Sequence, residues 1–169
     1  MKYVYLLRHA KSSWDDPSLA DFDRPLAPRG RDAAPRIGAR MQAQGLLPDA
    51  VLTSGARRAL ETWELVRPYL DEPQSRVEDN LYMATPDIMF AWLRLLQDEI
   101  GSVLLIGHNP GFEELATRLA GSGRKKALKR LRKKYPTATL AVLRFDVERW
   151  SEIAWGDAFL ERFIRPKDL

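Results

Sequence analysis

Residues 3–10 read Tyr-Val-Tyr-Leu-Leu-Arg-His-Ala, a run of aromatic, β-branched and aliphatic residues that ends in Arg8 and His9. Such a run is typical of a buried β-strand. Two further short apolar runs, residues 50–53 and 102–106, have the same form. We therefore predict three buried strands, the first of which carries Arg8 and His9 at its carboxyl end.

Segments with helical spacing separate these strands along the chain. We predict helices over residues 30–44, 56–70, 86–98 and 110–120, and two late strands over residues 140–147 and 152–155, joined by a tight turn. Strands that are apolar throughout and alternate with helices are typical of a mostly parallel sheet covered on both faces. We expect a three-layer α/β/α sandwich with an antiparallel edge strand, forming a single domain over residues 1–169.

The composition is that of a globular protein, with 45% hydrophobic and 30% charged residues. No apolar run approaches the roughly 20 residues that cross a bilayer, and no cleavage site typical of a signal peptide follows the N-terminal run. The chain has no cysteine, which excludes disulfides, thiolate metal sites and a cysteine nucleophile. We therefore expect a cytoplasmic protein with no membrane partner.

Both histidines of the chain come directly after predicted strands. His9 follows the first strand, His108 follows the third, and Ser54, Arg57 and Arg58 follow the second. The carboxyl ends of parallel strands meet at one edge of the sheet, where ligands bind in α/β folds. We therefore expect these side chains to form one site, with Arg57 as the member that has a structural role or faces solvent.

The residue types at this edge favour phosphoryl transfer. Planar guanidinium groups match the oxygens of a phosphoryl group, and a neutral imidazole can attack phosphorus to form a covalent phosphohistidine. No carboxylate cluster accompanies the histidines, so we predict a cationic pocket that needs no metal ion and no cofactor. The alternative is that each histidine is only a capping or loop residue at a strand end. The expected convergence of both histidines with arginines makes this alternative less favoured.

Four segments resemble the histidine phosphatase superfamily, which has the phosphoglycerate mutase-like fold. Residues 7–10 (LRHA) resemble its Arg-His-Gly signature, with Ala10 in place of the usual glycine. Residues 24–30 (RPLAPRG) resemble its helix entry, residues 53–62 (TSGARRALET) its Ser-x-x-x-Arg-x-x-x-Thr segment, and residues 106–110 (IGHNP) its second-histidine segment. The short length and the Gly-His-Asn-Pro sequence look most like the SixA branch, whose type member is a phosphohistidine phosphatase.

The resemblance implies roles for individual residues. His9 would be the nucleophile, Arg8 and Arg58 would bind the phosphoryl oxygens, and His108 would contact the same group and stabilise the transition state. We add Ser12, in the loop after His9, as a further substrate-binding candidate. These residues form the predicted site.

A general acid is harder to place. Larger members of the superfamily carry an acidic residue in the region where this chain has Glu78 and Asp79, and the sequence does not choose between the two. Residues 81–84 (LYMA) resemble the SixA branch, which lacks a clear acid. Because an imidazole leaving group needs less protonation than an alkoxide, a missing acid favours phosphohistidine or another activated substrate over a sugar phosphate. The loop over residues 11–24 is the only candidate for a lid.

A basic cluster, residues 124–134, contains eight lysines and arginines and no acid. It accounts for the net charge of +4 and the isoelectric point near 9.5, because the remaining residues carry 19 bases and 23 acids. The simplest interpretation is a solvated helix face or a flexible insert. The cluster could instead steer acidic phosphoproteins toward the site. Nucleic acid ranks last, because no aromatic residues are interspersed with the bases.

Three functions follow from these observations. The first is a protein phosphohistidine phosphatase, with a phosphorylated protein as its partner. The second is a phosphatase that acts on a small phosphorylated metabolite. The third is a module that binds phosphate or a phosphoprotein without turnover, and the presence of all four pocket residues, Arg8, His9, Arg58 and His108, argues against it.

Overall fold

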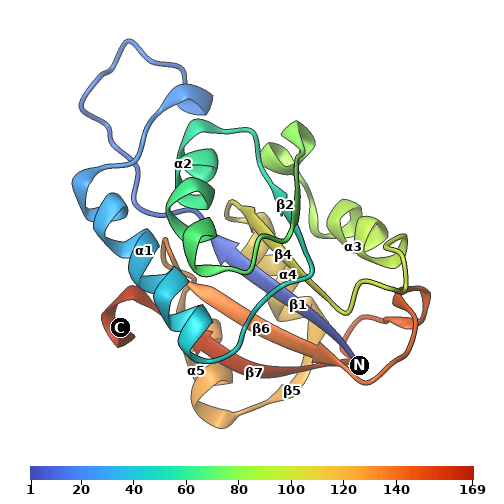
Figure 1. The fold of residues 1–169 in the computed structure, drawn as a ribbon. Coiled ribbons are helices and arrows are strands. Elements are labelled where there is room, and N and C mark those ends of the chain that lie inside the picture. The colour runs from blue at the N-terminus through green and yellow to red at the C-terminus, as the bar shows by residue number, and fades with distance from the viewer.

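The computed structural model describes all residues from 1 to 169, and a central seven-stranded sheet organises them (Figure 1). The strands are β1 (Lys2–Arg8), β2 (Ala50–Thr53), β3 (Gln74–Val77), β4 (Ser102–Gly107), β5 (Ala120–Gly123), β6 (Leu140–Phe145) and β7 (Ala158–Ile164). The helices are α1 (Pro28–Ala43), α2 (Arg57–Val66), α3 (Pro86–Arg94), α4 (Gly111–Leu119) and α5 (Lys125–Lys133). Short 3₁₀ segments lie at Asp21–Asp23, Arg67–Tyr69, Asp79–Met83, Trp150–Glu152 and Pro166–Asp168.

The strand order is β3-β2-β4-β1-β6-β7-β5. The strands from β3 to β1 pair in parallel, whereas β6 runs antiparallel to both of its neighbours, β1 and β7. The prediction of a mostly parallel sheet with antiparallel pairing between the late strands is confirmed. All parallel strands end at the same edge, from which the loop after β1 projects at the upper left of Figure 1.

Helices cover both faces of the sheet, as expected for a three-layer sandwich. The helices α1 and α2 enclose one core, which contains Leu7 and Ile106 from the central strands. The helices α3, α4 and α5 enclose the other, which contains Leu6 and Leu105. Neighbouring residues of one strand point to opposite faces, so the continuous apolar runs of β1 and β4 supply side chains to both cores.

Several predicted elements differ from the structure. Residues 152–155 do not form a strand, and the last strand is β7, twelve residues after β6 rather than across a tight turn. Ile153 is buried because it packs into the core from an irregular segment, which explains its strand-like apolar character. The helix predicted to reach residue 98 ends at Arg94. Strand β3 gave no sequence signal, because all four of its residues are exposed at the sheet edge.

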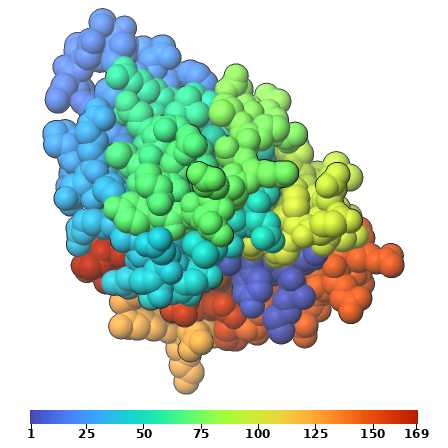
Figure 2. All heavy atoms as spheres, in the orientation of Figure 1, coloured from blue at the N-terminus to red at the C-terminus, as the bar shows by residue number.

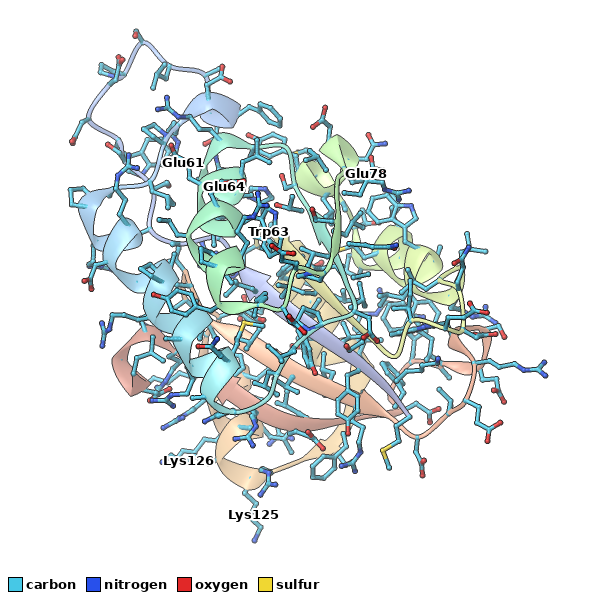
Figure 3. The ribbon with its side chains drawn as sticks, in the orientation of Figure 1. Glu61, Trp63, Glu64, Glu78, Lys125 and Lys126 are labelled. Carbon is cyan, nitrogen blue, oxygen red and sulfur yellow. The ribbon has the colours of Figure 1, made fainter.

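The basic cluster forms the ordered helix α5, which corrects the alternative of a flexible insert. Ala127 and Leu131 are buried against the sheet, and the basic residues occupy the outer side. Figure 2 shows the start of this helix as a protrusion, and Figure 3 shows Lys125 and Lys126 extending away from the body of the molecule. No helix in the structure has the length and apolar character needed to cross a membrane.

Candidate active site

The ends of β1 and β4 and the start of α2 bring four predicted residues together. The His9 and His108 ring centroids are 5.1 Å apart, and Nε of Arg58 lies 3.3 Å from Nε2 of His9. The exposed fractions of His9, Arg58 and His108 are 5%, 6% and 7%. Arg8 precedes His9 on β1 and is half-buried. These side chains therefore lie together at one edge of the sheet, as the sequence predicts.

The hydrogen bonds of His9 select one tautomer. Nδ1 lies 2.7 Å from the carbonyl oxygen of Ala10, which can only accept, so Nδ1 carries the proton. The Nε of Arg58 donates to Nε2, which therefore presents its lone pair. An imidazole held in this way has its nucleophilic nitrogen unprotonated and oriented before any substrate arrives.

The loop that carries His9 is braced from α2. The backbone N–H of Ala10 donates to Oγ1 of Thr62 at 3.0 Å, and that hydroxyl donates to the carbonyl oxygen of Arg58 at 2.7 Å. The Ala10 side chain is fully buried, so its extra methyl group relative to glycine packs into the core. The departure from the superfamily signature therefore leaves the ligand side of the loop open.

His108 is oriented by Ser54, which lies at the end of β2. Nε2 of His108 is 2.7 Å from Oγ of Ser54, and the same hydroxyl accepts from the N–H of Ala56. The buried Ser54 hydroxyl has no other acceptor within hydrogen-bond distance, so we assign it as the donor to Nε2, which leaves the ring proton of His108 on Nδ1. This Nδ1 is buried and has no hydrogen-bond partner within the protein. A buried donor without an acceptor at this place is suited to an oxygen of a bound anion.

Arg8 is held from the opposite side of the site. Its NH1 donates to the carbonyl oxygen of Tyr135 at 2.8 Å, and Nδ2 of Asn109 donates to the same oxygen at 3.1 Å. The Nε of Arg8 is buried and has no partner. The protein therefore holds the guanidinium through NH1, and the buried Nε is left to donate to a ligand.

Burial decides the protonation state of both histidines. Desolvation lowers the pKa of His9 to about 3, and the nearby His108, Arg58 and Arg8 add to the shift. Desolvation is also the main reason why the pKa of His108 is lowered to about 3, and the positive charge of Arg58 is the second. Both imidazoles are therefore neutral in the free protein at pH 7, as a nucleophilic nitrogen requires.

The loop over residues 11–24 reaches this site through Asp21. The Asp21 carboxylate accepts from NH2 of Arg58 at 3.0 Å and from Nε of Arg24 at 3.0 Å, and its backbone oxygen accepts from NH1 of Arg58 at 2.7 Å. The Tyr82 hydroxyl donates to the same carboxylate. That bond, with those from the two arginines, lowers the pKa of Asp21 to about 2. A carboxylate thus occupies guanidinium donors that a phosphoryl group would use.

Tyr82 forms a further wall of the site. Its ring lies edge-on to His108 with the centroids 5.2 Å apart, and Phe22 packs edge-on against it at 5.0 Å. Asp21, Phe22 and Tyr82 are not among the site residues predicted from the sequence. Residues 21 and 58 are 37 positions apart, and no local pattern signals a contact between them.

The remaining candidates lie beside the four central residues. The Ser12 hydroxyl accepts from NH1 of Arg24 at 2.8 Å, so it supports the loop in this structure. Glu78 caps the 3₁₀ segment that follows β3, because its side chain accepts from the N–H of Asn80. The Asp79 carboxylate packs against Gly55, where a Cβ atom would overlap it. Arg57 faces solvent, as predicted, and its side chain pairs with Glu61.

Comparison with known proteins gives the family of the chain. Residues 4–82 match the family model described as histidine phosphatase superfamily (branch 1). An uncharacterized protein of Mycobacterium tuberculosis, Rv1276c, is 38% identical over 163 residues, which cover 95% of this chain and 100% of the relative. The chain belongs to the histidine phosphatase superfamily. Membership of this superfamily assigns it to the phosphatase hydrolases.

Solved structures of histidine phosphatases extend the likeness to the whole chain. A protein from Agrobacterium tumefaciens, provisionally named phosphohistidine phosphatase SixA, is 31% identical, with a TM-score of 0.82 and 98% of each chain covered. A protein of the same provisional name from Nakamurella multipartita is 27% identical, with a TM-score of 0.82 and coverage of 98% of this chain and 96% of that one. A protein histidine phosphatase SixA complexed with tungstate shares the fold, at 24% identity and a TM-score of 0.79, with 98% of each chain covered. The predicted phosphoglycerate mutase-like fold and the SixA-type likeness are both confirmed.

Proposed function

We propose that this histidine phosphatase hydrolyses phosphohistidine in proteins by way of a covalent phosphoryl intermediate on His9. The observation that carries the proposal is the state of His9, which is buried and neutral and directs its Nε2 lone pair toward the Arg58 guanidinium. A phosphoryl group held by Arg58 would place its phosphorus next to this lone pair. Attack requires the Arg58 Nε–H to release Nε2 and turn to a phosphoryl oxygen, so that the lone pair lies in line with the bond to the leaving group.

In the first step, Nε2 of His9 attacks phosphorus and forms a P–N bond while the bond from phosphorus to the leaving group breaks. The leaving group departs with the bonding electron pair. Free donors of Arg8 and His108, together with the Arg58 guanidinium, bind the equatorial oxygens, whose negative charge is redistributed in the transition state. The carbonyl oxygen of Ala10 stabilises the positive charge that His9 acquires through Nδ1–H.

In the second step, water attacks the phosphorus of the phosphohistidine, and the P–N bond breaks. His9 Nε2 recovers its lone pair, the water gives up a proton to solvent or to the released phosphate, and inorganic phosphate leaves. No step of this scheme needs a metal ion, and no group of three or more His, Asp or Glu side chains in the structure could hold one. Metal independence is thus part of the proposal, and activity in excess chelator tests it.

The leaving group determines which substrate fits this site. Asp21 is the carboxylate that contacts the Arg58 guanidinium, and its pKa of about 2 means that it is ionised and cannot donate a proton near neutral pH. Glu78 is occupied as a cap, and Asp79 packs against Gly55. A site without a protonated carboxyl favours a leaving group that takes its proton from solvent. Phosphohistidine has this property, because its other ring nitrogen is protonated near neutral pH and the group then leaves as a neutral imidazole.

A small phosphorylated metabolite is the second candidate. Its supporting observation is the contact of Asp21 and Phe22 with Arg58 and Tyr82, because a loop that closes over a site suits a small substrate. Ser12 would join such a site only if the bond from Arg24 to its hydroxyl opened. We place the enzyme in the cytoplasm under either substrate.

One experiment separates the two substrates. A phosphohistidine-bearing carrier protein and a panel of phosphorylated sugars and acids are compared by kcat/KM in the same phosphate-release assay. We expect the phosphoprotein to exceed every metabolite by at least about tenfold. A metabolite that exceeded the phosphoprotein would make the second candidate the function, and the absence of release from any substrate or aryl phosphate would contradict both.

A further inference from the structure

A second cationic region lies at the same sheet edge as His9, on the other side of β1. It is a cavity of about 430 Å³, lined by the loop after β1, the start of α1, the end of α5 with the segment that follows it, and the tail after β7. Because β7 runs parallel to β1 while β6 runs antiparallel, the end of β7 and the start of β6 both lie at this edge. Residues distant in sequence therefore meet there, and Figure 1 shows the C-terminus beside α1.

The lining of this cavity is strongly positive. Eight lysine and arginine side chains contribute to it, against one carboxylate, that of Asp32. Five of the eight form no ion pair within 4 Å and no side-chain hydrogen bond. These five are Lys11, Arg29, Lys133, Lys134 and Lys167. Like charges gathered in a concave site concentrate anions there and repel each other in their absence.

Two of the arginines are held in fixed positions. Asp168 accepts from Arg165 at 2.9 Å and from Arg130 at 3.2 Å, and the side chains of all three are 18–21% exposed. A single carboxylate thus orients two guanidinium groups in the wall of the cavity without neutralising both. Preorganised guanidinium groups lose less conformational entropy on binding an anion than free side chains do.

The cavity is separate from the His9 site, although the two share a wall. The segment over residues 135–138 binds Arg8 through the carbonyl oxygen of Tyr135 and binds the carbonyl oxygens of Arg8 and His9 through the N–H of Ala138. Its residues Pro136, Thr137 and Ala138 also line the cavity. No histidine, and neither Arg8 nor Arg58, belongs to the lining.

We propose that this cavity is a binding site for a small molecule that carries several phosphate groups in a chain. The volume lies in the range of small-molecule sites, and the number of unpaired cations matches an anion with several charges rather than a single phosphate. Only two of the lining residues are hydrophobic, so the phosphates rather than an apolar part of the ligand would supply the recognition. The site is independent of the reaction at His9.

The test measures binding rather than turnover, so its result does not depend on the proposed function. The full chain with Arg58→Ala serves as the background, because this change disables the catalytic pocket. Inorganic tripolyphosphate and ATP are titrated by calorimetry, with inorganic phosphate and a phosphate-free acidic peptide as comparison probes. We expect tripolyphosphate to bind at least about tenfold more tightly than phosphate, with an affinity that falls as salt is added.

Matched charge reversals locate the site. Lys133→Glu with Lys167→Glu changes two cavity residues, and Lys125→Glu with Lys129→Glu makes the same change in net charge on α5 outside the cavity. We expect the first pair to weaken tripolyphosphate binding about tenfold or more and the second to change it less than about twofold. Lys→Gln versions of both pairs, checked by thermal unfolding, exclude a folding defect as the cause of a loss.

Three outcomes would overturn the proposal. One is an equal loss in both pairs, which would indicate general attraction to the basic surface. Another is equal or tighter binding of the acidic peptide, which would make the cavity a docking site for protein segments. The third is the absence of measurable tripolyphosphate binding in the Arg58→Ala background together with binding in the unchanged protein, which would place the anion in the catalytic pocket. If ATP binds as tightly as tripolyphosphate, nucleotides are ligands of the cavity. If ATP binds much more weakly, the ligand is inorganic polyphosphate.

Discussion

Two regions of this molecule gather positive charge at one sheet edge, and they do so in different ways. Around His9, the arginines are buried or half-buried, and each is held by a protein oxygen, Arg58 by Asp21 and Arg8 by the carbonyl of Tyr135. In the cationic cavity, Lys133 and Lys167 are exposed and have no partner. The first arrangement fixes donors around one small group, as catalysis requires. The second arrangement provides a positive electrostatic potential that attracts a larger anion.

The difference shows that charge alone does not identify a catalytic site. What distinguishes the His9 site is the pair of desolvated imidazoles, each with a tautomer set by an oxygen, that of Ala10 for His9 and that of Ser54 for His108. The cavity has no imidazole. Substitutions in the two regions should therefore differ in kind: loss of turnover in one and loss of anion affinity in the other.

The largest effect should come from His9→Ala. Removing the nucleophile should lower kcat for an aryl phosphate on the order of 10⁴-fold, while the fold remains intact. Phosphate release measures the rate, and circular dichroism checks the fold. Activity equal to that of the unchanged protein would end the assignment of His9 as nucleophile.

The neighbouring arginines of α2 provide the sharpest matched pair. Arg58→Ala should lower kcat/KM on the order of 10²- to 10³-fold, because it removes a donor for the phosphoryl oxygens. Arg57→Ala removes an exposed side chain paired with Glu61 and should change kcat/KM less than about twofold. Similar losses in both variants would mean that α2 contributes general charge rather than a positioned donor.

A smaller effect, a gain in affinity for a phosphate-like anion rather than a loss of activity, should follow Asp21→Asn. The change removes the carboxylate that competes for the Arg58 donors, so inhibition by orthovanadate should tighten about threefold. Asp23→Asn, in the same 3₁₀ segment and without an ion pair, is the control. Weaker inhibition in Asp21→Asn would show that Asp21 positions Arg58 rather than occupying its donors.

The two histidines should show no titration across the usual pH range. Their pKa values of about 3 predict that neither imidazole resonance shifts between pH 8 and pH 5 in the free protein. Between pH 6.5 and 3 the unfolded chain binds protons at these imidazoles and the folded chain does not, so the free energy of unfolding should fall as the pH falls through that window. Nuclear magnetic resonance and thermal unfolding measure the two effects. A midpoint near 6.5 for either histidine would contradict its burial.

The central part of the fold and the pocket could be predicted because their signals are local. Strands β1, β2 and β4 are short apolar runs. His9 and His108 directly follow β1 and β4, and Arg58 lies in the first turn of the helix after β2. Parallel pairing then brings their ends together without any knowledge of side-chain positions. Strand β3 has no buried residue and β5 pairs through small residues, so neither carries an apolar pattern.

The contacts that complete the two regions could not be predicted, because they join distant residues. Asp21 meets Arg58 across 37 positions, and Arg8 meets Tyr135 across 127. The basic residues of α5 were visible as a cluster, but their meeting with Lys11, Arg29 and Lys167 depends on the tail after β7 folding back to α1. Such contacts follow from the packed structure rather than from any spacing in the sequence.

Locating the phosphoryl group during turnover tests most directly whether His9 is the nucleophile. The enzyme is mixed with excess aryl phosphate and quenched in alkali, which preserves phosphohistidine, and its peptides are analysed by mass spectrometry. We expect one phosphoryl group on His9 and none in the Arg58→Ala protein at the same time point. A phosphoryl group on His108, or steady phosphate release with neither histidine ever modified, would contradict this expectation.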